Sequence, residues 1–265
     1  MSNISNLKSL KNHNTFGVDV SAKYFAEVNS VEELRETLNY SKTQSLPTLF
    51  LGGGSNILFT KDFDGLVIQL NLRGISEEIL NENEVLVTAK AGENWHEFVQ
   101  FCLNKNYGGL ENLFLIPGNV GTSPMQNIGA YGTEIKGTFV SCKVLNLETL
   151  NKNDDTQIAV EVFDHEKCNF GYRESIFKRE GKGKYIILEV TFKLTRKDHL
   201  IKTEYGAISA ELKNLGISTT LNVTNQDSLH VTNSNLPTVT IQDISRAVIN
   251  IRESKLPDPK VIGNA

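Results

Sequence analysis

Residues 116–132, IPGNVGTSPMQNIGAYG, have the composition of a loop that holds a ligand against bare backbone. The segment contains four glycines and two prolines and follows an apolar stretch at residues 113–116. Glycine has no Cβ to keep a ligand off the main chain, and proline fixes its own φ and favours extended geometry in the residue before it. Such a stretch presents many N–H groups on a fixed surface, which suits a large phosphate-bearing ligand. On glycine content alone, an ordinary irregular loop is an equal alternative.

A second glycine cluster occupies residues 51–56, LGGGSN, between a strand-like segment at 47–51 and the apolar residues 57–59. A strand that runs into bare N–H groups can hold a pyrophosphate. The cluster is not a Rossmann fingerprint, because Ile57 stands where the third glycine belongs, and no Gly-Lys-Ser/Thr follows to make a P-loop. Alone, it is more often a plain hairpin turn. Together, the two loops favour a dinucleotide cofactor.

The elements that position these loops follow from caps and hydrophobic periodicity. Ser30 predicts a helix N-cap, with Glu33 completing a capping box and the helix running to about Tyr40. A strand is predicted at 65–70, which completes a small α/β unit over about residues 15–70. A second unit begins with a strand at 85–89 and a helix at 95–104, which leads into the long glycine segment. Further strands are predicted at 139–145, 159–163 and 185–192.

The C-terminal part is predicted to be helical around a polar loop. A helix is expected near residues 207–215, and residues 217–240 are rich in Ser, Thr and Asn. Thr240 predicts the N-cap of a last helix that ends before Pro257, although Asp243 makes a weaker capping box than Glu. Its apolar residues fall at helical spacing on one face, namely Ile244, Val248 and Ile251.

Composition is that of a soluble globular protein, with 39% hydrophobic and 22% charged residues among 265. The net charge of −4 gives no global field for nucleic acid. A local basic run is interrupted by Glu180 and predicts a solvated loop (Lys178, Arg179, Lys182 and Lys184). Three cysteines without a C-x-x-C pair indicate a reducing compartment and no metal site or disulfide framework. No segment has the length or hydrophobicity of a signal peptide or a membrane span, so a cytoplasmic protein is expected.

Motifs along the chain resemble the UDP-N-acetylenolpyruvoylglucosamine reductase (UDP-N-acetylmuramate dehydrogenase) family. The resemblance runs from about Asn14 to the last residue. It rests on the two glycine loops together with NTFG at 14–17, AGENWH at 91–96, GLEN at 109–112, FGYRESIFK at 170–178, TEYG at 203–206 and KLPDPK at 255–260. The motifs GYRES and LPDPK are specific to that family, and the TEYG segment resembles the longer of its two subtypes.

The resemblance implies an α+β fold, namely the two-lobed FAD-binding fold of the vanillyl-alcohol oxidase type, followed by an incomplete α/β substrate domain. It implies FAD-binding lobes at 1–70 and 71–200 and the start of a substrate domain at 201–265. In the implied reaction NADPH reduces FAD, and the flavin passes a hydride to the enolpyruvyl double bond of a UDP-sugar in peptidoglycan precursor synthesis. Because residues 116–132 contain neither His nor Cys, non-covalent flavin is favoured.

The resemblance also assigns site residues. Arg173 matches the catalytic arginine, and a fixed, forked cation suits the negative charge that develops beside the substrate carboxylate; taken alone, a lone arginine is more often a surface ion pair. Tyr172, Tyr205 and Lys255 match substrate-binding positions, and the residues expected to bind FAD are Gly52, Gly53, Gly54, Ser55, Asn56, Pro117, Gly118, Gly121, Thr122, Ser123, Gln126, Asn127, Gly129, Ala130, Tyr131, Gly132 and Ile187. His96 is interpreted as structural.

Family members continue beyond Ala265 with a Gly-Ser-Phe-Phe segment and roughly 70 further residues, on a domain-size argument. That part carries the family's proton-donor serine and a catalytic glutamate, so this chain alone is expected to retain at most flavin binding. The resemblance further implies a monomer with a UDP-sugar substrate and no nucleic-acid or membrane partner. Two alternatives stay open, a flavin-binding fragment without catalysis and another FAD oxidoreductase of the same fold, such as a sugar or hydroxy-acid oxidase.

Overall fold

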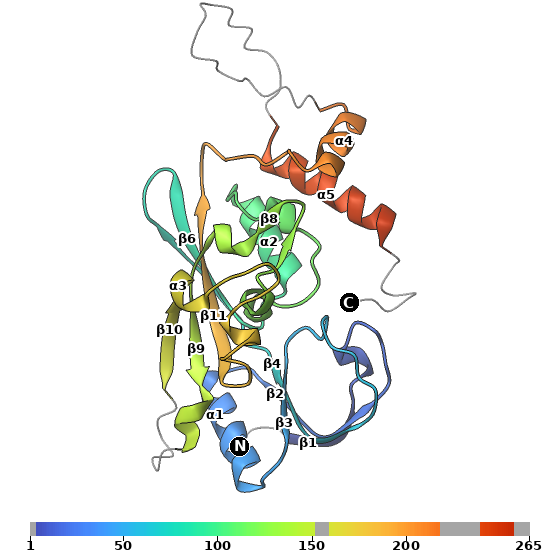
Figure 1. The fold of residues 1–265 in the computed structure, drawn as a ribbon, viewed down its shortest axis with the longest axis vertical. Coiled ribbons are helices and arrows are strands. Elements are labelled where there is room, and N and C mark those ends of the chain that lie inside the picture. Colours follow the sequence, from blue (N-terminus) through green and yellow to red (C-terminus); the bar gives the residue numbers. More distant parts are fainter. Residues whose placement is uncertain (1–3, 152–158, 218–238, 257–265) are drawn as a thin grey trace, which may run out of the picture.

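The computed structural model describes residues 4–151, 159–217 and 239–256. Figure 1 shows a small sheet with its helix α1 in the lower part of the molecule, a larger sheet of long strands at the left, and two helices, α4 and α5, at the top. The predicted loop at 217–240 lies mostly outside the described residues, as do Pro257 and the residues that follow it.

The smaller sheet has the strand order β1-β2-β4-β3. Its strands are β1 (Ile4–Ser9), β2 (Ser21–Val28), β3 (Thr48–Leu51) and β4 (Phe63–Leu70), and α1 spans Val31–Thr43. β1 pairs antiparallel with β2, whereas β2 and β3 both run parallel to the central strand β4. Central parallel strands are covered on both faces. Accordingly Leu66 and Ile68 enter one hydrophobic cluster with α1, and Val67 enters another on the opposite face.

The larger sheet is antiparallel throughout, with the order β10-β9-β11-β6-β5. Its strands are β5 (Ile75–Ile79), β6 (Glu84–Lys90), β9 (Phe139–Asn146), β10 (Val160–Asp164) and β11 (Tyr185–Thr195). Helix α2 (Trp95–Asn104) buries Trp95, Phe98 and Val99 in the main core together with this sheet. Leu145, Ile186 and Leu188, near one end of β9 and β11, join the α1 cluster instead, so the two sheets share a core.

Short elements complete the chain between these strands. A two-stranded hairpin is formed by β7 (Gly129–Ala130) and β8 (Thr133–Glu134). Its two-residue loop has positive φ at both Tyr131 (50°) and Gly132 (75°), as a type I′ turn requires. The short helices are η1 (Lys11–His13), η2 (Glu111–Leu113), η3 (Val120–Gln126), η4 (Ile135–Gly137), η5 (Leu147–Asn151), α3 (His165–Cys168) and η6 (Ile176–Lys178).

Helices α4 (Gly206–Asn214) and α5 (Ile241–Lys255) pack onto the main core. The apolar face of α5 is buried, since Ile244 and Val248 are 0% exposed and Ile251 is 5% exposed. Helix α4 and the main core cover this face.

Most predicted helices and strands are confirmed with bounds that differ by a few residues, and both bounds of α2 agree with the prediction. The caps differ from expectation. Thr240 and Asp243 form the reciprocal capping box, with both hydrogen bonds present. Ser30 caps α1 as predicted, but the Glu33 carboxylate accepts from the N–H of Asn29 at 2.7 Å and not from Ser30. Strands β1, β2 and β5 were not predicted. Among the described residues, no helix combines the length and the hydrophobicity that crossing a bilayer requires.

Candidate functional site: two pockets joined by one glycine-rich segment

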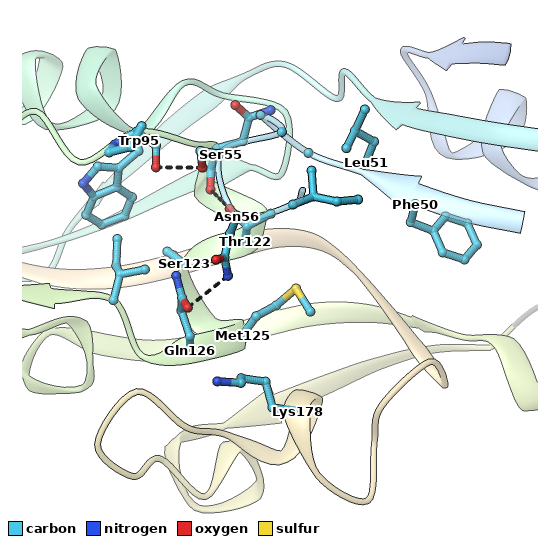
Figure 2. A pocket seen from close by; sticks show the side chains of 17 residues that line it. Phe50, Leu51, Ser55, Asn56, Trp95, Thr122, Ser123, Met125, Gln126 and Lys178 are labelled. Carbon is cyan, nitrogen blue, oxygen red and sulfur yellow. Dashed lines mark hydrogen bonds between the residues drawn. The ribbon is translucent and has the colours of Figure 1, made fainter. Parts of the chain in front are cut away.

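The first glycine loop lies at the carboxyl end of β3, where parallel strands usually present ligand sites. Residues 52–56 leave the strand there and face residues 117–126 of the second loop (Figure 2). The hydroxyl of Ser55 donates to the carbonyl oxygen of Pro117 at 3.2 Å, and the amide of Asn56 donates to Gln126 Oε1 at 3.2 Å. The two loops therefore meet as the sequence predicts.

Between the loops lies a pocket of about 280 Å³, here called the loop pocket. It is lined by Phe50, Leu51, Gly52, Gly53, Gly54, Ser55, Asn56, Ile57, Trp95, Pro117, Asn119, Thr122, Ser123, Met125, Gln126, Ile128 and Lys178. Thirteen of these residues come from the two predicted loops, 51–56 and 116–132, and Figure 2 shows the polar ends of Asn56, Gln126 and Lys178 around the same space. Lys178 is exposed, as predicted for the basic run, yet it also borders the pocket, and its Nζ donates to the carbonyl oxygen of Arg173 at 2.9 Å.

Glycine is required where the loops approach one another. A Cβ on Gly53 would stand 2.8 Å from Gly118 Cα and 2.9 Å from Asn119 Oδ1. Gly54 and Gly118 have φ of +66° and +115°, a region that other residues rarely adopt. Gly53 and Gly118 therefore serve contact between the loops as well as access for a ligand, whereas Gly54 packs closely against His13 and Asn14.

The second loop is held from behind by the AGENWH motif. The N–H of Trp95 donates to Gly118 O at 3.0 Å, that of Val120 donates to Glu93 O at 2.8 Å, and that of Gly121 donates to Ala91 O at 3.0 Å. The Trp95 indole is 1% exposed and donates to Leu113 O at 2.9 Å. This buried support fixes the loop without using its outward-facing N–H groups.

The first loop carries a row of unused donors. Within the part of the chain that the structure describes, the backbone N–H groups of residues 52–56 donate to no protein acceptor, and the same holds for Gly118 and Asn119. Backbone N–H groups that converge without a Cβ in front of them form an anion-binding concavity. These residues therefore fit a diphosphate-bearing cofactor such as FAD.

A second pocket, of about 480 Å³, lies around the β7–β8 hairpin and is here called the arginine pocket. It is lined by Gly129, Ala130, Tyr131, Gly132, Thr133, Glu134, Lys136, Gly137, Tyr172, Arg173, Lys202 and Tyr205. Segment 116–132 thus borders both pockets, with its first part at the loop pocket and its last residues at the arginine pocket. Arg173 and Tyr172 from the FGYRESIFK motif come together here with Tyr205 from the TEYG motif.

Arg173 is held in an unusual conformation. Its φ is +52°, and its guanidinium donates to the carbonyl oxygen of Gly129. The guanidinium carbon also lies 5.7 Å from the ring centre of Tyr172, which is 84% exposed. A non-glycine residue in the left-handed region marks a backbone that its surroundings constrain. The arrangement places a permanent cation at the edge of the arginine pocket.

Two further cations border this pocket that the sequence analysis did not single out. Lys136 follows the hairpin and pairs with Glu134 at 2.9 Å, and Lys202 precedes the TEYG motif. Tyr205 packs edge-on against Tyr131 at 5.5 Å between ring centres. The position of Lys202 next to the TEYG motif could have indicated its role from the sequence. No local sequence feature indicated Lys136.

Five predicted site residues line neither pocket. Three of them lie next to lining residues on segment 116–132 (Gly118, Gly121 and Asn127), and the other two lie elsewhere in the fold. Lys255 is exposed at the end of α5, and Ile187 is 5% exposed within the main core on β11. Neither borders the loop pocket or the arginine pocket as they are lined here. Their assignments stay predictions.

The histidine and cysteine side chains have structural surroundings. Burial lowers the pKa of His96, whose ring packs edge-on against Phe114 at 4.4 Å between centres. Cys102, Cys142 and Cys168 are free and buried. Among the described residues, no group of three or more His, Cys, Asp or Glu side chains is arranged to hold a metal ion.

Comparison with known proteins agrees with this site. Residues 22–158, which include the first glycine loop and segment 116–132, match the family model described as FAD binding domain. A UDP-N-acetylenolpyruvoylglucosamine reductase from Flavobacterium johnsoniae is 49% identical over 259 residues, covering 97% of this chain and 68% of that protein. The chain belongs to the UDP-N-acetylenolpyruvoylglucosamine reductase family. The resemblance, the FAD cofactor and the class of FAD-dependent oxidoreductase are thereby confirmed.

Solved structures support the fold of this reductase family member. The crystal structure of UDP-N-acetylenolpyruvylglucosamine reductase from Thermus caldophilus covers 97% of this chain and 97% of its own, with a TM-score of 0.56 and 23% identity. A VAO-type flavoprotein from Myceliophthora thermophila covers 66% of this chain and 32% of its own, with a TM-score of 0.50 and 13% identity. The predicted fold class is therefore confirmed.

Proposed function

We propose that the protein catalyses the NADPH-dependent, FAD-mediated reduction of UDP-N-acetylenolpyruvoylglucosamine to UDP-N-acetylmuramate, for peptidoglycan precursor synthesis. The observation that carries the proposal is the position of Arg173, at a pocket whose wall continues along segment 116–132 into the loop pocket. The name of the Flavobacterium relative supports the same substrate. We further propose a cytoplasmic monomer with lobes at 1–70 and 71–200 and substrate-domain residues from 201 onward.

The loop pocket is assigned to the cofactor. The unused N–H groups of residues 52–56 face a diphosphate, and residues 117–132 extend from there towards Arg173. Bound there, FAD would supply the transfer of a hydride from NADPH to the enolpyruvyl double bond. The absence of a histidine or cysteine from residues 116–132 supports non-covalent attachment.

The arginine pocket is assigned to the substrate. Arg173 carries a charge that does not titrate, and its forked donors can bind a carboxylate while negative charge develops next to it. Lys136 and Lys202 supply two more cations for a diphosphate, and Tyr205 offers a hydroxyl and an aromatic face. We keep Tyr172 and Lys255 as substrate-binding candidates on the family motifs alone.

Anaerobic half-reactions test the proposal. Two preparations are compared, this chain and a fusion, here called the extended chain, that adds the part of the Flavobacterium relative that this chain does not cover. NADPH should bleach the flavin, and the enolpyruvyl substrate should restore the colour, with UDP-N-acetylmuramate identified by mass. Bleaching without recovery in either preparation would favour the non-catalytic alternative, and bleaching of the oxidised flavin by a sugar or hydroxy acid in place of NADPH would favour an oxidase.

A further inference from the structure

Three hydrogen bonds fasten the loop that carries Arg173 onto segment 125–129. At one end the Ser175 hydroxyl donates to Met125 O at 2.7 Å, and at the other end Asn127 Nδ2 donates to Gly171 O at 2.9 Å. Between them the Arg173 guanidinium donates to the carbonyl oxygen of Gly129. The arginine loop and the cofactor segment are therefore held in one relative position.

Asn127 is built for this contact. Its side chain is 0% exposed, and its backbone is left-handed with φ of 44° and ψ of 61°. Besides Gly171 O, its Nδ2 donates to Glu134 Oε2 at 3.0 Å, and its Oδ1 accepts from the N–H of Lys136 at 3.1 Å. Asparagine offers two amide donors and an acceptor and tolerates the left-handed region. Both ends of the amide are thus engaged with the protein and join three segments.

The loop needs such a constraint because Arg173 itself has φ of +52°. A side chain in this region relaxes when its surroundings no longer hold it. Relaxation at Arg173 would turn the guanidinium away from Gly129 and out of the arginine pocket. Ser175, which is 0% exposed and also accepts from the N–H of Phe177 at 3.2 Å, fixes the other end of the same turn.

We propose that Asn127 and Ser175 are positioning residues that hold Arg173 in its reactive orientation, and that Asn127 acts through this loop and not through contact with the cofactor. The proposal rests on the function assigned above to Arg173. Asn127 sets the N-terminal side of the loop and Ser175 the C-terminal side. Loss of either one affects hydride transfer only while the arginine is present.

The hydrogen bonds that Asn127 and Ser175 make between segment 125–129 and the arginine loop are here called the clamp. Two variants each remove one side of the clamp, and one matched variant leaves it intact. Asn127→Gly keeps the positive φ without strain and deletes all three amide hydrogen bonds, and Ser175→Ala deletes a single hydroxyl. Asn169→Gly is the control. Asn169 also has positive φ, 45°, but its side chain is exposed and makes no hydrogen bond to the described part of the chain.

Hydrogen exchange tests the clamp without any activity. Peptides that cover residues 170–176 should exchange about tenfold faster in Asn127→Gly and in Ser175→Ala than in the parent, because local opening controls exchange. Peptides from β9 and β11 should keep the parent rates, and Asn169→Gly should match the parent throughout. If Asn127→Gly does not fold, the exchange rates of Ser175→Ala alone test the proposal. Unchanged exchange at residues 170–176 in a folded Asn127→Gly or Ser175→Ala variant overturns it.

A double-mutant cycle tests the route of action. In the extended chain, Asn127→Gly should slow reoxidation of the reduced flavin by substrate about tenfold or more, with flavin content and bleaching by NADPH retained. In an Arg173→Ala background the same change should cost less than about twofold. Equal losses in both backgrounds, or loss of flavin from Asn127→Gly, would contradict positioning through Arg173. If the parent itself fails to reoxidise with substrate, the proposed function fails, while the exchange experiment still decides on the clamp.

Discussion

Ser55 donates a hydrogen bond to the carbonyl oxygen of Pro117 at 3.2 Å, although 62 positions separate the two residues. Ser55 belongs to the loop that leaves the smaller sheet, and Pro117 belongs to the segment held against α2 by Trp95. The loop pocket therefore exists only when both parts of the fold are in place. Cofactor binding and the packing of the two sheets are consequently expected to depend on each other.

Gly53→Val should release the flavin. The new Cβ would approach Gly118 Cα to 2.8 Å and force the loops apart. Overpacking of this kind costs about 1–3 kcal/mol, which corresponds to about a tenfold to hundredfold loss of affinity. Flavin absorbance per chain in the purified protein measures the effect. Gly206→Ala is the matched control, since a Cβ there meets nothing within 4 Å, and full flavin content in Gly53→Val would refute the loop assignment.

Arg173→Ala should separate the two half-reactions. The variant should keep FAD and oxidise NADPH at the parent rate but lose hydride transfer to the enolpyruvyl substrate by ~10²–10³-fold, as expected for a preorganised charge. Arg173→Lys should recover little, because a lysine cannot fork onto a carboxylate. Stopped-flow reoxidation of the reduced flavin measures the step. A loss below about tenfold would place Arg173 outside the reaction.

Ile244→Ala should destabilise the protein by about 2–5 kcal/mol, the usual cost of truncating a fully buried aliphatic side chain. Ile244 on α5 is 0% exposed within the main core. Urea unfolding of this chain measures the change. Glu253→Ala, at an exposed position of the same helix, should stay within about 0.5 kcal/mol. Equal stability of the two variants would mean that α5 does not pack on the core in solution.

The Tyr107–Glu77 pair should make stability depend on pH. The Tyr107 hydroxyl donates to Glu77 Oε2 at 2.6 Å, and this hydrogen bond, with a smaller contribution from Lys105, lowers the pKa of Glu77 from its ordinary 4.5. Stabilisation is then complete above pH 4.5 and is lost as the pH falls through the lowered value. Tyr107→Phe should cost about 1 kcal/mol at neutral pH and progressively less in acid. A loss of stability in Tyr107→Phe that is the same at neutral and at acid pH would exclude the ionised carboxylate as the cause.

Sequence patterns predicted the parts of the fold with strong local signals. Helix α2 has a cap at Asn94 and a buried apolar face, and its bounds agree with the prediction. Strand β1 has a burial pattern that is almost entirely exposed, and β5 is an edge strand with four exposed residues. Neither has a hydrophobic alternation to detect. Pairing with neighbouring strands, which is a tertiary effect, creates both.

In the candidate site, too, the sequence predicted the features that depend on local residue types and not those that depend on tertiary contacts. Glycine content and family motifs identified both loops and Arg173, because a ligand cradle needs particular residue types. They could not reveal that Gly53 also meets Gly118, that Lys178 borders the loop pocket, or that Asn127 joins the arginine loop to the cofactor segment. These contacts link residues that are distant in sequence, and only the folded chain brings them together.

The flavin content of the purified protein tests the central claim most directly. If the two glycine loops form an FAD cradle, the protein should be yellow, and acid should release FAD, identified by mass, in about one copy per chain; a stripped sample should regain the colour with added FAD. A colourless preparation that does not take up FAD, although circular dichroism shows it to be folded, would contradict the assignment of both loops.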